Sequence, residues 1–340
     1  MPLAKKNVIF VYRSGDSDSL TVANKYRSIH DLDSDQLVSI SCSNTEVLKN
    51  ENDFNSEVLN PIKSAISSLT NRTVWAVVLG FNVPGGFHHG QDVIASTSRI
   101  ARLNHSFDKQ VRNYLYDRAS FKRFDGTDAN FALISTRVDA PTVAICEDML
   151  DKTREFEKQG LANGKFYIDP YSDRFGLEAT TYQNDILDFA NRELKDTGLN
   201  TFSTVFLDPY IDVVLPFAED DSFVWSWFSD RGSLSFFKNT NAARVFFYNA
   251  DYDGAFTVRD VNDRRWPSLA IQEGYIATAG AMSNPGFEGL MRPRPFFKTL
   301  LEGGTLGEAF LFSATFLDWT INFFGDPLIP VVFPIGRVFI

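Results

Sequence analysis

Two adjacent histidines and a cysteine are the residues of this chain that could carry out nucleophilic catalysis. His88 and His89 lie in the run Pro84-Gly-Gly-Phe-His-His-Gly90, after the third expected strand, and Cys42 ends the second. α/β sheets bind ligands beyond the carboxyl ends of their strands, where an imidazole can act as a base or a metal ligand. Cys42 could pair with a histidine only if this loop folded across the top of the sheet. The alternative is a solvated turn.

The other residues that could bind a metal ion or act as a nucleophile are better explained as structural residues. Asp251 and Asp253, with Asp260 and Asp263 further on, could hold Ca²⁺ or Mg²⁺. They lack the ordered spacing and central glycine of an EF-hand loop, which favours a solvated acidic loop. Cys146 lies among apolar residues of an expected helix, as a buried and inert thiol would. We therefore expect no resident metal and no cofactor.

Short apolar runs alternate with longer amphipathic runs along the chain. Strands are expected over residues 7–12, 37–42, 74–80, 131–136, 165–168, 204–207, 244–248 and 275–279. Helices are expected over residues 19–30, 57–69, 92–103, 141–158, 181–195, 267–273, 295–301 and 305–319. This alternation indicates an α/β fold with mostly parallel sheets flanked by helices. The expected core residues are Val8, Phe10, Val77, Leu79, Leu133, Phe246 and Ile276, and in the last helix Leu306, Phe310, Ala314 and Leu317.

Four different motifs follow one another along the chain, and their order is informative. They are Phe131-Ala-Leu-Ile-Ser-Thr-Arg-Val-Asp-Ala-Pro-Thr142, Trp266-Pro-Ser-Leu-Ala-Ile-Gln-Glu-Gly-Tyr-Ile-Ala-Thr-Ala-Gly280, Thr299-Leu-Leu-Glu-Gly-Gly-Thr-Leu-Gly-Glu-Ala-Phe310 and Asn322-Phe-Phe-Gly-Asp-Pro-Leu-Ile-Pro330. Over about residues 7–333 they resemble an uncharacterised family related to the gingipains, cysteine peptidases that are relatives of the caspases. The resemblance implies a two-lobed caspase/gingipain-like architecture. It places an N-terminal subdomain at 1–137, with an excursion at 104–130, and a C-terminal subdomain at 138–340.

The resemblance also implies where a catalytic dyad should lie. In active gingipain-like enzymes one strand ends in Gly-His-Gly, and the next ends in the cysteine whose thiolate attacks the peptide carbonyl. At the histidine's place this chain has Asn249, Ala250 and Asp251, and no cysteine follows Cys146. The resemblance therefore implies a degenerate dyad region and no catalytic residues.

Composition excludes several classes of partner. The 340 residues carry a net charge of −10 without a basic stripe, which argues against nucleic acid. No apolar run approaches the roughly 20 residues that span a membrane, and the first residues do not resemble a signal peptide. Two cysteines suit a reducing cytoplasm and exclude a disulfide scaffold. We expect a cytoplasmic protein, or one assembled into a particle.

Two apolar stretches are candidates for contacts with other proteins. The run Phe223-Val-Trp-Ser-Trp-Phe228 is either a partner-binding surface or part of an irregular helix, and the chain's last residues dock either on their own domain or on a neighbour's sheet edge. The candidate interaction residues are Phe223, Trp225, Trp227, Val338, Phe339 and Ile340. We expect a non-catalytic structural or interaction protein with other protein subunits as partners, for example in a phage virion. The alternative is an active hydrolase with an unrecognised site.

Overall fold

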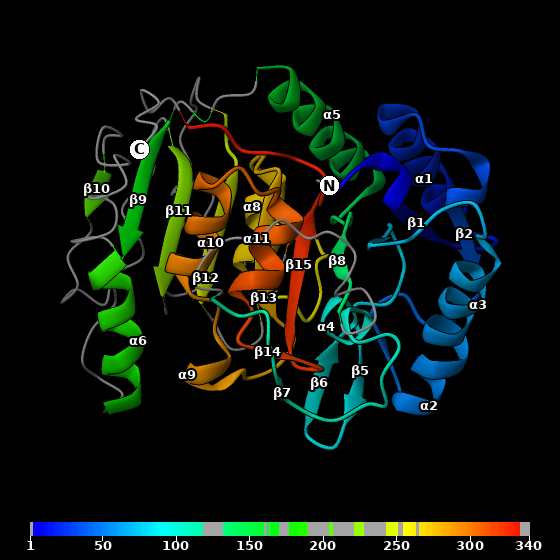
Figure 1. The fold of residues 1–340 in the computed structure, drawn as a ribbon, viewed down its shortest axis with the longest axis horizontal. Coiled ribbons are helices and arrows are strands. Elements are labelled where there is room, and N and C mark those ends of the chain that lie inside the picture. Colours follow the sequence, from blue (N-terminus) through cyan, green and yellow to red (C-terminus); the bar gives the residue numbers. More distant parts are fainter. Residues whose placement is uncertain are drawn as a thin grey trace.

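The main sheet of the computed structural model has ten strands, with helices on both faces (Figure 1). The structure describes residues 3–117, 132–159, 162, 164–169, 177–189, 204–206, 221–227, 243–250, 254–262 and 265–333. In order across the sheet the strands are β10 (Thr204–Phe206), β9 (Lys165–Asp169), β11 (Asp221–Trp227), β12 (Phe246–Ala250), β13 (Ala277–Ala281), β15 (Ile321–Gly325), β8 (Ile134–Arg137), β4 (Ala76–Leu79), β1 (Val8–Arg13) and β2 (Leu37–Ile40). The expected α/β fold class, a mostly parallel sheet flanked by helices, is confirmed.

The sheet consists of two parallel halves that run in opposite directions. Neighbouring strands are parallel from β10 to β13 and again from β15 to β2, whereas β13 and β15 are antiparallel. The carboxyl ends of the strands therefore lie at one edge of the sheet in the first half and at the opposite edge in the second. The two halves share one continuous sheet, and β15 of the expected C-terminal subdomain belongs to the half that β8, β4, β1 and β2 form. A domain boundary at residues 137 and 138 stays a prediction.

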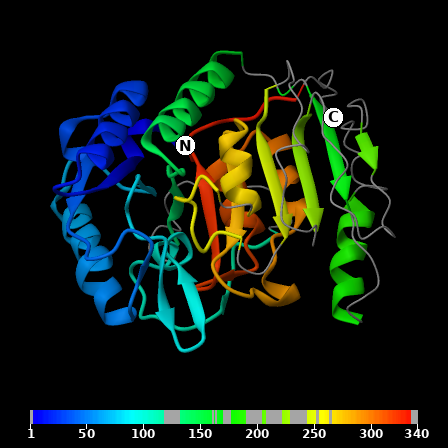
Figure 2. The same cartoon turned by 180° about the vertical axis from the view of Figure 1, so that it is seen from behind.

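Helices and short strands surround the main sheet. The helices are α1 (Ser17–His30), α2 (Glu51–Phe54), α3 (Asn60–Ser68), α4 (Ser96–Ala101), α5 (Val143–Gln159), α6 (Leu177–Asp188), α8 (Trp266–Gln272), α9 (Gly286–Gly289), α10 (Pro293–Leu301) and α11 (Leu306–Ser313). The short strands are β3 (Val47–Leu48), β5 (Gly86–His89), β6 (Asp92–Ala95), β7 (Val111–Arg112) and β14 (Phe316–Leu317). Helices α10 and α11 lie in front of the sheet in Figure 1, and α8 covers the other face, which Figure 2 turns toward the viewer.

Alternate residues of the strands pack into different layers of the core. Val8 and Phe10 of β1 contact the layer beneath α1, α10 and α11, whereas Ile9 and Val11 contact the layer beneath α3. The seven core residues expected from the strands are all at most 4% exposed. Strands are found at all eight expected places. Because both faces are covered, the strands are nearly continuous apolar runs, as parallel sheets require.

Two expected helices are shorter than their sequence pattern. Residues 92–95 form β6, which pairs with β5 across a turn at Gly90, where φ is +64°, so the helix begins at Ser96. The last helix ends at Ser313, because Asn113 Nδ2 donates to the carbonyls of Leu311 and Ala314 and satisfies its final turn. The four expected buried residues of this segment are nevertheless all buried.

The aromatic run at residues 223–228 is neither a surface nor a helix over the residues that the structure describes. Residues 221–227 form β11, a strand between β9 and β12. All seven residues are buried, including Phe223, Trp225 and Trp227. The prediction that these three side chains form an interaction surface is therefore wrong. A strand covered on both faces buries the side chains that point to either side, which explains an uninterrupted apolar run.

Candidate functional site

The sequence resemblance places the degenerate dyad region at the carboxyl end of β12, whose neighbour in the sheet is β11. Ser226, Asn249 and Ala250 are all buried there. Ser226 Oγ donates a hydrogen bond of 2.9 Å to Asn249 Oδ1. Neither the amide nor the hydroxyl is a base at neutral pH, so this pair contains no group that would activate the serine as a nucleophile. Asp251 and Asp253, the candidate metal ligands, lie outside the described residues.

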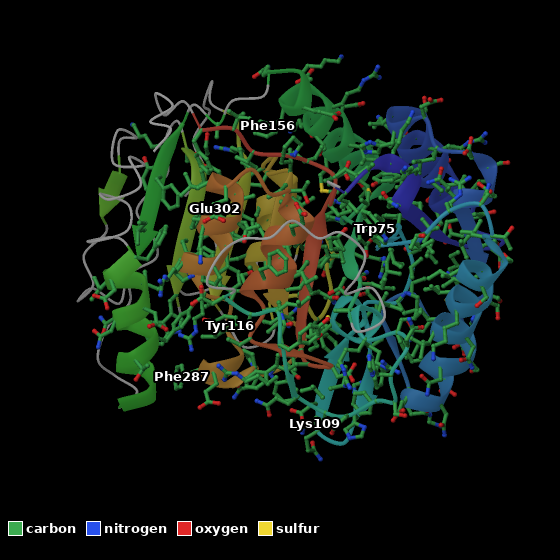
Figure 3. All side chains as sticks on the ribbon, in the orientation of Figure 1. Trp75, Lys109, Tyr116, Phe156, Phe287 and Glu302 are labelled. Carbon is green, nitrogen blue, oxygen red and sulfur yellow. The ribbon has the colours of Figure 1, made fainter. Side chains whose placement is uncertain are left out.

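Aromatic side chains fill the space around these strand ends. The Trp227 ring meets Tyr182 edge-on at 5.3 Å and Phe287 at 5.8 Å between centroids. Figure 3 labels Phe287, which lies below α10 in that view. The backbone N–H of Met291 donates to Tyr248 Oη at 3.3 Å, while Tyr182 Oη donates to the Met291 carbonyl at 3.0 Å. These contacts join β11, β12 and α6 to the segment before α10. Among the described residues, these side chains form a packed aromatic cluster on one face of the sheet near the ends of β11 and β12.

A cation lies over the same layer and is neutralised. The Arg292 guanidinium lies 4.6 Å from the centroid of the Tyr182 ring, and its Nη1 is 2.9 Å from Asp185 Oδ2. Burial raises the pKa of Asp185, although Arg292 opposes this rise. Arg292 Nη2 also donates to the Phe287 carbonyl at 3.1 Å. The contacts of this arginine are those of a structural residue.

Both cysteines are buried and poorly suited to form thiolates. Cys42 is 7% exposed, and burial, followed by the charge of Glu57, raises the pKa of its thiol to about 12. Cys146 is fully buried in α5, and burial, together with Asp139, raises the pKa of its thiol well above the ordinary value. A nucleophilic cysteine requires the opposite, an accessible thiol with a lowered pKa.

The chain's four histidines lie apart from these thiols. His88 is exposed near the tip of the β5–β6 hairpin, and His89 packs edge-on against Phe107 at 4.9 Å. His105 follows α4, and its carbonyl accepts a hydrogen bond from Arg99. In the described part of the chain, which includes all histidines and both cysteines, no hydrogen bond joins a thiol to an imidazole. The structure therefore does not bring Cys42 together with His88 or His89.

His30 forms a buried polar cluster that the sequence did not indicate. Its Nε2 lies 2.5 Å from Asp326 Oδ2, and Tyr26 Oη donates to Asp326 Oδ1 at 3.0 Å. The backbone N–H of Leu328 donates to the same carboxylate at 3.0 Å. Asp326 belongs to the Gly-Asp-Pro turn after β15, so this cluster fixes the turn to α1. The contacts explain the aspartate as a structural residue.

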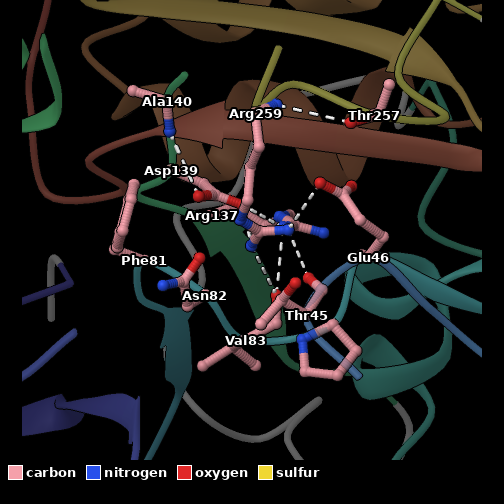
Figure 4. A network of polar contacts seen from close by, with 12 residues as sticks. Thr45, Glu46, Phe81, Asn82, Val83, Arg137, Asp139, Ala140, Thr257 and Arg259 are labelled. Carbon is pink, nitrogen blue, oxygen red and sulfur yellow. Dashed lines mark hydrogen bonds and ion pairs between the residues drawn. The ribbon is translucent and has the colours of Figure 1, made fainter. Parts of the chain in front are cut away.

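A charged network of four side chains lies where β4 and β8 end, in the other half of the sheet (Figure 4). Arg137 and Arg259 both contact Oδ2 of the fully buried Asp139. Arg259 Nη1 lies 3.3 Å from Glu46 Oε1 and donates to the Thr45 carbonyl. Burial lowers the pKa of Arg137, while Asp139 opposes that shift. Two cations face two carboxylates, so the network is neutral overall.

This network joins segments that are far apart in the sequence. Arg259 lies in the loop after β12, whereas the Val83 carbonyl, to which both arginines donate, lies in the loop after β4. The motif Thr136-Arg-Val-Asp139 was visible at the end of a strand, but nothing in the sequence paired it with Arg259. Among the described residues, no group of three or more acidic, histidine or cysteine side chains could hold a metal ion. The network can position loops, and it offers no open coordination site.

Comparisons with known proteins identify no family for this chain. No family model matches it, and no curated protein does. Three chains of solved structures are similar. One of them, named "Structure of Protease", has a TM-score of 0.49 and 10% sequence identity, over 95% of this chain and 78% of that chain. A similarity of this size assigns no activity to any residue. No helix in the described part of the chain combines the length and apolarity needed to cross a membrane.

Proposed function

We propose that the chain is a non-catalytic interaction protein on a protease-like α/β scaffold that has lost its active site. One observation carries this proposal. The end of β12, where the sequence resemblance places the histidine of the dyad, holds Asn249 and Ala250, and both are buried, Ala250 in the core layer of Trp227 and Tyr182 and Asn249 on the other face beside Ser226. Neither residue presents an exposed nucleophile or base to a peptide carbonyl. The Val338–Ile340 segment, a candidate contact, lies outside the described residues.

The state of the cysteines supports the same proposal. With a pKa of about 12, Cys42 would be ionised in roughly one molecule in 100,000 at pH 7. Since the thiolate is the nucleophile, such a thiol attacks a carbonyl very slowly. Cys146 is still less accessible. The function left to this scaffold is to bind other protein subunits, and we propose a role in a larger assembly such as a virion.

A protease assay on the intact chain tests the loss of catalysis. A panel of fluorogenic peptides should give no turnover above a heat-denatured sample, and Cys42→Ala and Cys146→Ala should behave like the parent. Turnover that either substitution abolishes would overturn the proposal in favour of a cysteine hydrolase. Turnover that survives both would point to a hydrolase with another nucleophile and would overturn it equally.

A further inference from the structure

Strand β2 forms one end of the main sheet in the described part of the chain, where β1 is its partner (Figure 1). The carbonyl of Ile40 accepts from the N–H of Ser14, so the backbone groups of Ile40 and Val38 face β1. Successive residues of a strand point these groups to alternate sides. The C=O groups of Leu37 and Ser39 and the N–H of Ser39 therefore face outward. Such a row of groups is a template for another strand.

A groove of about 590 Å³ runs beside this edge. The strand forms one wall, and α3 with the residues after it forms the other. Leu37, Pro61, Ala65 and Leu69 contribute half-buried apolar side chains to the groove. A groove between an edge strand and a helix accepts an extended peptide, because backbone hydrogen bonds supply affinity and the apolar wall selects side chains. The shape and chemistry of this groove suit a strand better than a globular surface.

The end of the groove carries a surplus negative charge. Asp35 lines the groove with its side chain 42% exposed, and it shares the Arg72 guanidinium with Asp33. Two carboxylates thus face one cation. A fitting peptide is apolar with one basic residue. Residues 334–340, Pro-Ile-Gly-Arg-Val-Phe-Ile, have this composition, and Arg337 is their one charged side chain.

The same chain cannot place these residues in its own groove. Phe333, the last described residue, stacks on Phe223 of β11 at 5.5 Å. Seven strand spacings separate β11 from β2, which is about 34 Å at roughly 4.8 Å each. Seven extended residues span at most about 25 Å. An occupant from residues 334–340 must therefore come from a second molecule.

We propose that the groove beside β2 binds residues 334–340 of a second copy of this chain as an added strand. The inference rests on the proposed interaction function and names its partner. The groove lies at the β2 end of the sheet, whereas Phe333, the residue before the tail, packs on β11 near the other end, so each copy can bind one neighbour and be bound by another. Such a head-to-tail contact generates a ring of copies if the rotation between neighbours closes, and an open series of oligomers if it does not.

Sedimentation velocity of the intact chain over a range of concentrations tests the assembly. We expect a series of species that grows with concentration. Ala65→Glu, which puts a charge into the apolar wall, should shift the series to at least tenfold higher concentration. Ser64→Glu is the matched control, because Ser64 is exposed on the same helix outside the groove. A monomer at every concentration, or equal effects of both variants, would overturn the proposal.

A binding assay with the tail as a peptide tests the occupant. A fluorescent peptide of residues 333–340 should bind the intact chain. It should bind the Ala65→Glu variant at least tenfold more weakly than the Ser64→Glu variant. Ser39→Pro, which removes the outward N–H, should also weaken binding while circular dichroism shows a folded chain. The peptide with Arg337→Glu should bind more weakly at low salt. Failure to bind, or binding insensitive to Ala65→Glu, would refute the proposed occupant. Neither result bears on the protease assay, which alone decides the loss of catalysis.

Discussion

Arg259 Nη2 lies 2.8 Å from Asp139 Oδ2, although the two residues are 120 positions apart in the sequence. The contact joins the loop after β12 to the end of β8, and so it connects the two halves of the sheet (Figure 4). Asp139 is fully buried, and a carboxylate there depends on the two guanidinium groups that neutralise it. The loop is therefore held by charge as well as by packing.

Replacing Arg259 with Gln should destabilise the protein by about 3–5 kcal/mol, because Asp139 would keep one of its two cations in a buried site. Urea denaturation at pH 7 measures the free energy of unfolding. The matched control is Arg294→Gln, since Arg294 is 58% exposed and lies 3.8 Å from Asp117. That change should cost less than about 1 kcal/mol. Equal costs for the two variants would show that the network does not stabilise the fold.

The His30–Asp326 pair should make stability depend on pH. Burial alone lowers the pKa of His30, but the charge of Asp326 and their hydrogen bond, helped by Glu157, outweigh burial and the opposing Lys5. The pKa is therefore raised above its ordinary value of 6.5 in the folded state. A histidine whose pKa is raised on folding contributes stability that is fully present at pH values below its pKa in the unfolded chain. This stability is lost as the pH rises through its pKa in the folded protein.

The variant His30→Gln tests this linkage. The difference in unfolding free energy between the parent and the variant should be largest at pH 5.5–6 and should shrink as pH rises above about 6.5. Urea titrations at four pH values give the comparison. A difference that stays constant, or that grows with pH, would mean that the imidazole is not protonated in the folded protein.

Both thiols should be unreactive in the folded protein. Iodoacetamide attacks thiolates, and burial raises the pKa of both cysteines. At pH 8 mass spectrometry should find neither thiol alkylated over a time in which a free cysteine reacts completely. Both should react in 8 M urea, and Cys42→Ala should then show one modification. Rapid alkylation of the native protein at Cys42 would reveal an accessible thiol and reopen the question of catalysis.

The sequence was a good guide to local elements and a poor guide to long-range pairing. Apolar runs such as the one containing Val8 and Phe10 predict a strand because the whole run is buried. The run that forms β11 was not predicted as a strand, because its aromatic residues show no period and fit a surface, a helix or a strand equally well. The place of β15 between β13 and β8, and the pairing of Arg259 with Asp139, depend on how distant segments assemble. Hydrophobic periodicity contains no information on such partners.

The last prediction concerns the helix that packs against the junction of the two halves. Phe310 of α11 is buried, and its ring stacks on Phe323 of β15 at 4.8 Å, with Phe246 and Phe296 each at 5.8 Å. Because four rings meet here, Phe310→Ala should leave a cavity that its neighbours cannot fill, at a cost of about 3–5 kcal/mol.

Chemical denaturation measures this cost, with Leu20→Ala as the control. Leu20 lies on α1 and is 41% exposed, outside the packed core, so its truncation should cost less than about 1 kcal/mol. The slope of unfolding free energy against denaturant should stay the same in Phe310→Ala, since the cavity alters stability and not the surface exposed on unfolding. A cost below about 1 kcal/mol for Phe310→Ala would contradict the burial of this face and would make it a candidate contact surface.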